Sequence, residues 1–257
     1  MAWLKDKLQG SIFGRFVRNS IDTPTDNKSL SHLDLNAIYD RQTIEVMRRV
    51  LKRNSNGIDI GAHRGDILSQ MLTMAPAGTH HAFEPLPDYA ARLRRKFPKV
   101  RVHQMAVSDK SGEAEFQHVE NDPAYSGLKR RIYDRPDPQI VAIKVPVGTI
   151  DEIIPSDLPI AFIKIDIEGG EFHALTGAVN TIRRYRPVIV FEAGKNSTGE
   201  YGVSPTALYE LIETTLGYRL STMGRWLENE PPLTLPQFCH NWDHGPDFYF
   251  IATPAGE

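Results

Sequence analysis

A glycine-rich turn followed one strand–helix unit later by an acidic residue constrains this chain most. Residues 57–65 read Gly-Ile-Asp-Ile-Gly-Ala-His-Arg-Gly, and Phe-Glu-Pro follows at 83–85. The apolar residues before the turn indicate a short strand, and a helix is expected from Asp66. Such turns let backbone N–H groups approach a ligand, and an acid such as Glu84 is placed to accept hydrogen bonds from ribose hydroxyls. The pattern predicts that this part of the chain is an α/β unit that binds a nucleoside.

The glycine spacing favours S-adenosylmethionine (SAM) over a dinucleotide. A dinucleotide site needs Gly-x-Gly-x-x-Gly and a phosphate loop needs Gly-Lys-Ser/Thr, whereas this turn has Gly61-x-x-x-Gly65 with His63 inside it. Asp59 precedes the turn by two residues. Its carboxylate would repel a pyrophosphate but could orient the ammonium group of a methionine moiety. The alternative interpretation is a turn that only joins a strand to a helix.

Composition limits the class of protein. The chain has 257 residues, 40% of them hydrophobic, which is enough for one α/β domain with additions. A formal net charge of −2 does not suggest nucleic-acid binding. The single Cys239 excludes an intramolecular disulfide and is consistent with the cytoplasmic location that we expect. No apolar run reaches about 18 residues and no signal-peptide pattern is found, so no membrane-spanning helix is expected.

Residues 1–18 combine apolar residues at helical spacing with four basic residues and one acidic residue. Two interpretations stay open. The segment could lie on an anionic membrane surface as a basic amphipathic helix, or it could pack on the domain or on a second copy in a homo-oligomer. We predict an N-terminal helical extension over residues 1–53 and an α/β domain over residues 54–257.

Strand and helix patterns alternate after residue 57, which is typical of a mostly parallel sheet with helices on both faces. We expect, among others, one strand over 100–107, two strands over 113–119 and 140–147 around a long loop, and one helix over 169–185. Ligands of such sheets bind beyond the carboxyl ends of the strands.

Carboxylates follow several of the predicted strands. Bringing them to one edge is costly without a ligand, a metal ion or a shared proton, so Asp166, Glu168 and Glu192 are candidate catalytic residues. Asp166 has a structural alternative as the N-cap of the next helix. Glu168 has one as an acid in the first turn of that helix.

Three segments make the sequence similar to the FkbM-type SAM-dependent methyltransferases. They are Asp-Ile-Gly-Ala-His-Arg-Gly at 59–65, Phe-Glu-Pro at 83–85, and Ile-Lys-Ile-Asp-Ile-Glu-Gly-Gly-Glu at 163–171. The third is the most specific and resembles the Lys-Ile-Asp-Val-Glu-Gly-x-Glu stretch of the family. The likeness covers roughly residues 57–193.

The resemblance implies a class I methyltransferase (Rossmann-like) fold, with a seven-stranded, mostly parallel sheet, helices on both faces and an antiparallel last strand. It also implies cofactor contacts. Asp59, Gly61, His63 and Gly65 would surround the methionine part of SAM, Glu84 would hold the ribose, Ala106 and Val107 would border the adenine, Ser126 would reach in from a loop, and Asp166 would lie near the transferred methyl group.

The expected activity is methylation of a hydroxyl group on a sugar, a glycan or a glycosylated metabolite. An alcohol must lose its proton in this reaction, so the site requires a base such as Asp166, Glu168 or Glu192. Two of these carboxylates could instead bind Mg²⁺, which would lower the hydroxyl pKa.

Two other functions stay open. A nucleotide- or NAD-binding Rossmann-type enzyme would show Gly-x-Gly-x-x-Gly, which is absent. A non-catalytic SAM-binding module is compatible with His63, which stands where the family commonly has Asn.

Overall fold

The computed structural model describes residues 32–133, 137–245 and 247–256. The chain divides into two compact units, Met1–Ala37 and Ile38–Glu257, and the second unit carries every strand and every helix after α3 that is discussed below. Helix α3 (His32–Val50) begins in the first unit and continues in the second. The amphipathic helix predicted over residues 1–18 lies outside the described residues.

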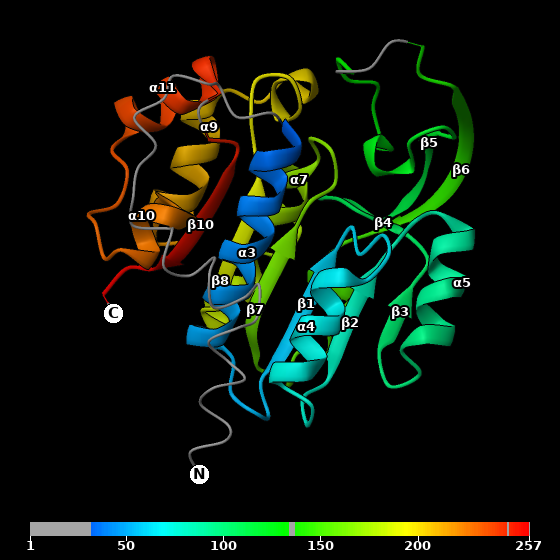
Figure 1. Ribbon diagram of the computed structural model, residues 1–257, viewed down its shortest axis with the longest axis horizontal. Coiled ribbons are helices and arrows are strands. Elements are labelled where there is room, and N and C mark those ends of the chain that lie inside the picture. The colour runs from blue at the N-terminus through cyan, green and yellow to red at the C-terminus, as the bar shows by residue number, and fades with distance from the viewer. Residues whose placement is uncertain (1–31, 134–136, 246, 257) are drawn as a thin grey trace, which may run out of the picture. The chain divides into compact units, whose positions relative to one another are not determined.

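A seven-stranded sheet in the order β3-β2-β1-β7-β8-β10-β9 forms the centre of the second unit (Figure 1). All neighbouring strands are parallel except β10, which is antiparallel to both β8 and β9. This is the predicted class I methyltransferase sheet, including its antiparallel last strand. The strands are β1 (Asn56–Ile60), β2 (His80–Phe83), β3 (Arg101–His103), β7 (Ile160–Ile165), β8 (Val188–Glu192), β9 (Tyr218–Thr222) and β10 (Tyr249–Pro254).

Helices cover both faces of this sheet because successive strand residues point to opposite sides. In β1, Ile58 and Ile60 join the large core that also contains Leu175 and Ile182 of two helices. Gly57 faces the other way, against Met71 of α4. The helices after α3 are α4 (Asp66–Met74), α5 (Pro87–Lys96), α6 (Ile150–Ile153), α7 (Glu171–Thr176), α8 (Val179–Tyr185), α9 (Pro205–Glu210), α10 (Met223–Leu227) and α11 (Leu235–His244).

The predicted strand over residues 100–107 is wrong in its extent. Its first part is β3 of the main sheet, whereas β4 (Ala106–Val107) pairs with β6 (Ile140–Gly148) in a separate three-stranded sheet. There β6 also pairs antiparallel with β5 (Gly112–Val119), which confirms the two strands expected around the long loop.

The predicted helix over residues 169–185 is interrupted. It begins only at Glu171 and breaks after Thr176 into α7 and α8. A side chain at Gly177 would lie 2.1 Å from the carbonyl oxygen of Ser108, so the backbone must pass very close there. The remaining short turns are η1 (Pro123–Tyr125), η2 (Thr198–Tyr201) and the wide turn η3 (Leu211–Thr215).

None of the helices within the described residues is both long and apolar enough to cross a lipid bilayer.

A pair of histidines joins β2 to the edge strand β3. His81 Nδ1 lies 3.0 Å from His103 Nε2, and the two rings stack with their centres 5.2 Å apart. Burial, and then the adjacent His103, lowers the pKa of His81 to about 4. The folded protein therefore holds His81 neutral at pH values where an unfolded histidine is charged.

We expect His81 to destabilise the fold in mild acid. Between the ordinary pKa of 6.5 and about 4, the unfolded chain binds more protons, so the free energy of unfolding decreases as the pH falls through this window. The contribution is up to about 3 kcal/mol. Denaturant unfolding at pH 7.5 and 4.5 should show a smaller decrease for His81→Gln than for the wild type, with His118→Gln as control. Equal decreases would contradict the assignment.

Candidate active site

The turn after β1 takes its shape from contacts within the protein. Gly61 and Gly65 have φ values of 80° and 77°, which favour glycine. A Cβ atom on Gly61 would lie 1.9 Å from the carbonyl oxygen of Asp166, and one on Gly65 would lie 2.5 Å from the ring of Phe97. The N–H groups of Gly61 and Ala62 donate to the carbonyl oxygen of Phe83. The turn thus fixes the ends of β1, β2 and β7 relative to one another.

Glu84 lies at the carboxyl end of β2 and is 4% exposed. Its two carboxylate oxygens accept hydrogen bonds from the N–H groups of His63 and Leu86, each at 2.9 Å. Burial raises the pKa of Glu84 to about 7, although these two bonds lower it. Each oxygen retains a second acceptor position. A buried acceptor pair at this place fits a ligand that offers two hydroxyl donors, as a ribose does.

His63 contributes through its backbone and through its ring. The residue has a φ of 45° and donates its N–H to Glu84. Its ring stacks on Tyr89 at a centre distance of 4.5 Å, and burial lowers its pKa. The neutral ring covers the side of the turn that faces helix α5.

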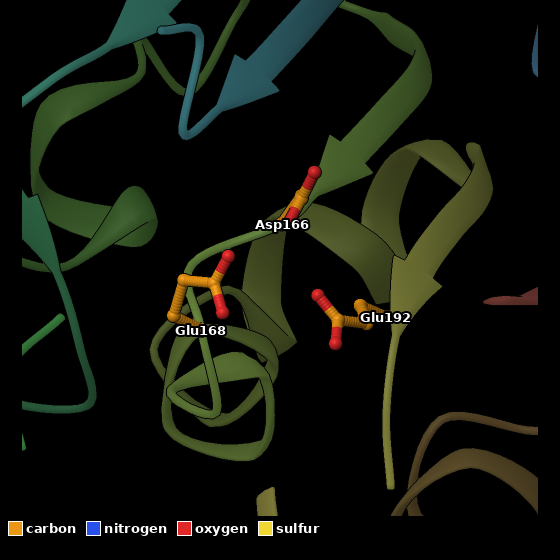
Figure 2. Close-up of side chains that lie close together, drawn as sticks. All are labelled: Asp166, Glu168 and Glu192. Carbon is orange, nitrogen blue, oxygen red and sulfur yellow. The ribbon is translucent and has the colours of Figure 1, made fainter. Parts of the chain in front are cut away.

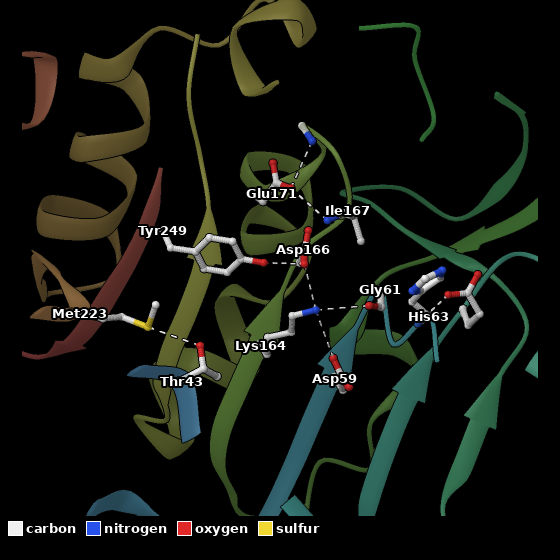
Figure 3. Close-up of polar contacts among 12 residues, drawn as sticks. Thr43, Asp59, Gly61, His63, Lys164, Asp166, Ile167, Glu171, Met223 and Tyr249 are labelled. Carbon is white, nitrogen blue, oxygen red and sulfur yellow. Dashed lines mark hydrogen bonds and ion pairs between the residues drawn. The ribbon is translucent and has the colours of Figure 1, made fainter. Parts of the chain in front are cut away.

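A buried lysine connects the two halves of the sheet edge (Figure 3). Lys164 Nζ lies 3.8 Å from Asp59 Oδ1 and 3.1 Å from Asp166 Oδ2, and donates to the carbonyl oxygen of Gly61 at 3.3 Å. Asp59 is only 1% exposed, and burial raises its pKa. The cation beside Asp59 is therefore supplied by the chain itself, at the position where the sequence suggested the ammonium group of a ligand.

Three carboxylates converge at the ends of β7 and β8, where Figure 2 shows Asp166, Glu168 and Glu192. Their nearest carboxylate oxygens all lie within 4.8 Å of one another. The side chain of Asp166 keeps 27% of its surface exposed, so a ligand can reach the cluster. The structure thus brings together the three residues that the sequence singled out as catalytic candidates.

Glu171 fixes the turn that carries Glu168. Its Oε1 accepts hydrogen bonds from the N–H groups of Ile167 and Gly169, both at 3.1 Å, and its Oε2 accepts one from Thr198 Oγ1 at 3.2 Å. These bonds hold Glu168 at a φ of 62°. Helix α7 begins beyond this turn and has Gly170 as its N-cap. Asp166 is therefore not a helix cap, and its carboxylate serves the cluster.

The charges of the cluster are uneven. Burial raises the pKa of Asp166, but Lys164 and the hydrogen bond from Tyr249 Oη at 2.5 Å outweigh it, so the net pKa lies below its ordinary value. Burial, and then repulsion by Asp166 and Glu171, raises the pKa of Glu192 well above its ordinary value. A carboxylate oxygen of Glu192 lies within 4.8 Å of one of Asp166. Glu192 thus retains a proton under conditions where Asp166 is ionised.

The loop between β5 and β6 lies against Glu168. Arg131 forms an ion pair with Glu168, and its guanidinium group lies over the ring of Tyr125 at 5.2 Å. Ser126 is 8% exposed, and its Oγ accepts a hydrogen bond from the N–H group of Val119. This hydroxyl therefore anchors the loop. Its predicted contact with the cofactor stays a prediction.

Ala106 and Val107 end β4 and are buried. Ala106 packs in a small cluster that includes Leu86, and Val107 joins the main core. Their predicted place beside adenine stays a prediction.

Sequence reasoning missed Lys164, Arg131 and Tyr249 as members of the site. Lys164 could have been recognised, because it is a lysine inside an otherwise apolar strand and a buried charge needs a partner. No local pattern distinguished Arg131 in its loop or Tyr249 at the start of the last strand.

Comparisons with known proteins agree with this geometry. Residues 59–220, more than half of the chain, match the family model of the methyltransferase FkbM domain. No curated protein sequence matches the chain.

Three solved structures resemble the chain at low identity. Methyltransferase FkbM from Methylobacillus flagellatus is 19% identical with a TM-score of 0.48, and the alignment covers 79% of this chain and 44% of that one. Precorrin-6y C5,15-methyltransferase from Geobacter metallireducens is 16% identical with a TM-score of 0.41, over 79% and 81% of the chains. A TehB-like SAM-dependent methyltransferase from Corynebacterium glutamicum is 13% identical with a TM-score of 0.42, over 93% and 94%.

The chain spans less than half of the Methylobacillus protein. The family match alone covers most of the α/β domain, and that domain has the seven-stranded sheet with an antiparallel last strand that the resemblance implied. By that match, the chain belongs to the FkbM family of SAM-dependent methyltransferases.

Proposed function

We propose that the protein methylates a hydroxyl group of a sugar, in a glycan or a glycosylated metabolite. The observation that supports this most is the cluster of Asp166, Glu168 and Glu192, whose nearest carboxylate oxygens lie within 4.8 Å of one another at the carboxyl edge of the sheet. When bound, SAM supplies a methyl group on a positively charged sulfonium. An alcohol must lose its proton as it accepts that group, so the site needs a base.

Glu192 is the proposed base. Its raised pKa gives its ionised form more basicity than an ordinary glutamate has, and a base whose pKa lies near the working pH is the most effective. Asp166 is held ionised by Lys164 and Tyr249. It is therefore suited to balance positive charge near the reacting atoms.

The part of the sheet edge at the ends of β1 and β2 would hold the cofactor. Glu84 offers two buried acceptor oxygens to the ribose hydroxyls. The turn from Gly61 to Gly65 shapes the floor beside it, and Asp59 acts through Lys164 rather than through a free carboxylate. This division supports binding of SAM next to the carboxylate cluster.

The three carboxylates also fit a divalent cation, since oxygen ligands suit Mg²⁺. Asp166, Glu168 and Glu192 would hold it, and it would lower the pKa of the acceptor hydroxyl. One observation favours the base instead: Arg131 already pairs with Glu168.

We expect Glu192→Gln to lower methyl transfer by about two to four orders of magnitude, the usual contribution of a general base. Transfer from SAM to a panel of methyl glycosides would be followed by mass spectrometry. Affinity for S-adenosylhomocysteine (SAH) should stay near the wild-type value, because the amide keeps the size of the side chain. Glu45→Gln on α3, where the Glu45 side chain is 42% exposed, is the matched control. Methylation of amines or carboxylates but not of glycosides would refute the proposed substrate class, and cofactor binding without transfer to any acceptor would favour a non-catalytic module.

Glu84→Ala should weaken SAH binding at least about tenfold, since each hydrogen bond to a charged group contributes about 1.5–3 kcal/mol. Calorimetric titration measures the affinity, with NAD as a negative control ligand. A parallel melting curve shows whether the loss of the two backbone contacts of Glu84 alone unfolds the turn. Unchanged SAH affinity in a folded variant would remove Glu84 from the cofactor site.

Methyl transfer should persist in excess EDTA if Glu192 is the base. The measurement is the initial rate with EDTA, with added Mg²⁺, and without either. A rate that EDTA abolishes and Mg²⁺ restores would replace the base mechanism with the metal-assisted one.

A further inference from the structure

An open cleft of about 570 Å³ lies at the edge of the second unit, where β9 ends. Its volume is within the range of pockets that hold small organic ligands. Side chains of α10, α11 and the segments that follow them line it. Besides Thr222 of β9, the polar residues that line it are Arg225, Glu230, Gln237, His240, Asn241 and Asp247.

This cleft lies on the same edge of the sheet as the carboxylate cluster. The sheet order is β7-β8-β10-β9, so two strand spacings, or about 10 Å, separate the end of β8 from the end of β9. Glu192 ends β8, and Thr222, which also lines the cleft, ends β9. A ligand of two linked rings could therefore reach from one to the other.

Direct contacts connect the cleft to the cluster. Tyr39 Oη donates to Asp247 Oδ1 at 3.2 Å, and the Tyr39 ring stacks on Tyr249 at a centre distance of 5.2 Å. Tyr249 in turn donates to Asp166 Oδ2 at 2.5 Å. The two tyrosine rings thus connect Asp247 of the cleft to Asp166 of the cluster.

The charges in the cleft are balanced. Arg225 pairs with Glu230 at 3.0 Å and donates twice to the carbonyl oxygen of Pro231. Burial raises the pKa of Asp247, so this carboxyl group is less readily ionised than an ordinary aspartate. The Asn241 amide and the His240 ring on α11 offer further hydrogen-bond donors and acceptors. This lining suits a neutral, hydroxyl-rich ligand better than a phosphate or a carboxylate.

We propose that this cleft binds the sugar residue next to the one that is methylated. The inference rests on the proposed function and deepens it: the acceptor is a neutral disaccharide or longer chain. The free monosaccharide fills the place beside Glu192 but leaves the cleft empty.

The test compares methyl glycosides of single neutral sugars with the matching disaccharides, on the SAH-loaded full chain. Dissociation constants come from ligand-observed NMR, and kcat/KM comes from the transfer assay with SAM. We expect the matching disaccharide to bind about tenfold more tightly than its monosaccharide, the gain that two or three hydrogen bonds to a neutral ligand give. In His240→Ala/Asn241→Ala the ratio between the two affinities should fall to about one.

Asp243→Asn is the matched control, since Asp243 is an exposed residue of α11 that does not line the cleft. Equal affinity for both lengths in the wild type, or a length effect that the double variant retains, would overturn the proposal. Failure to bind any neutral saccharide would overturn it as well. If monosaccharides are methylated without any gain from a second ring, the cleft assignment alone fails and the methyltransferase function stands.

Discussion

A buried ammonium group between β1 and β7 determines how the edge of this sheet is assembled. Asp59 and Lys164 are direct partners in the β1–β7 pairing, and Lys164 is 8% exposed. A charge removed from water is tolerated only when it is paired and hydrogen-bonded, and here three oxygens surround it. A shift of the register by one residue would turn Lys164 toward the isoleucine-rich core on the other face. The ion pair therefore fixes the register on which both halves of the site depend.

The antiparallel last strand has a chemical consequence. In the parallel strands the carboxyl ends supply Glu84, Asp166 and Glu192. Because β10 runs the other way, its beginning lies at that edge, so Tyr249 meets Asp166 and Asp247 opens toward the cleft. The strand order thus places, along one edge, Glu84 and the glycine turn at β2 and β1, the three carboxylates at β7 and β8, and the polar cleft at β10 and β9.

Much of the fold and of the candidate site could be predicted from the sequence, because the patterns that indicate them are local in the chain. Apolar runs and glycine spacing indicate β1 and its turn, and parallel strands bring Glu84, Asp166 and Glu192 to one edge wherever their order places them. The other contacts depend on positions far apart in sequence. The partner of Lys164 follows from a register that one sequence does not reveal, and Gly177 breaks a helix only because Ser108 passes beside it. The N–H groups of the turn were expected to contact a ligand. They donate instead to Phe83 and Glu84, which are also distant in sequence, so these contacts could not be predicted either.

The unequal charges of Asp166 and Glu192 follow from the same strand order. Each of two carboxylates this close disfavours ionisation of the other, and the nearest cation decides which of them ionises more readily. Lys164 lies on β7, two residues before Asp166, while Glu192 lies one strand farther away and faces Asp166 and Glu171. Electrostatic energy falls with distance, so Lys164 stabilises the ionised form of Asp166 first. The fold thereby makes one carboxylate a fixed charge and leaves the other as the group that can exchange a proton.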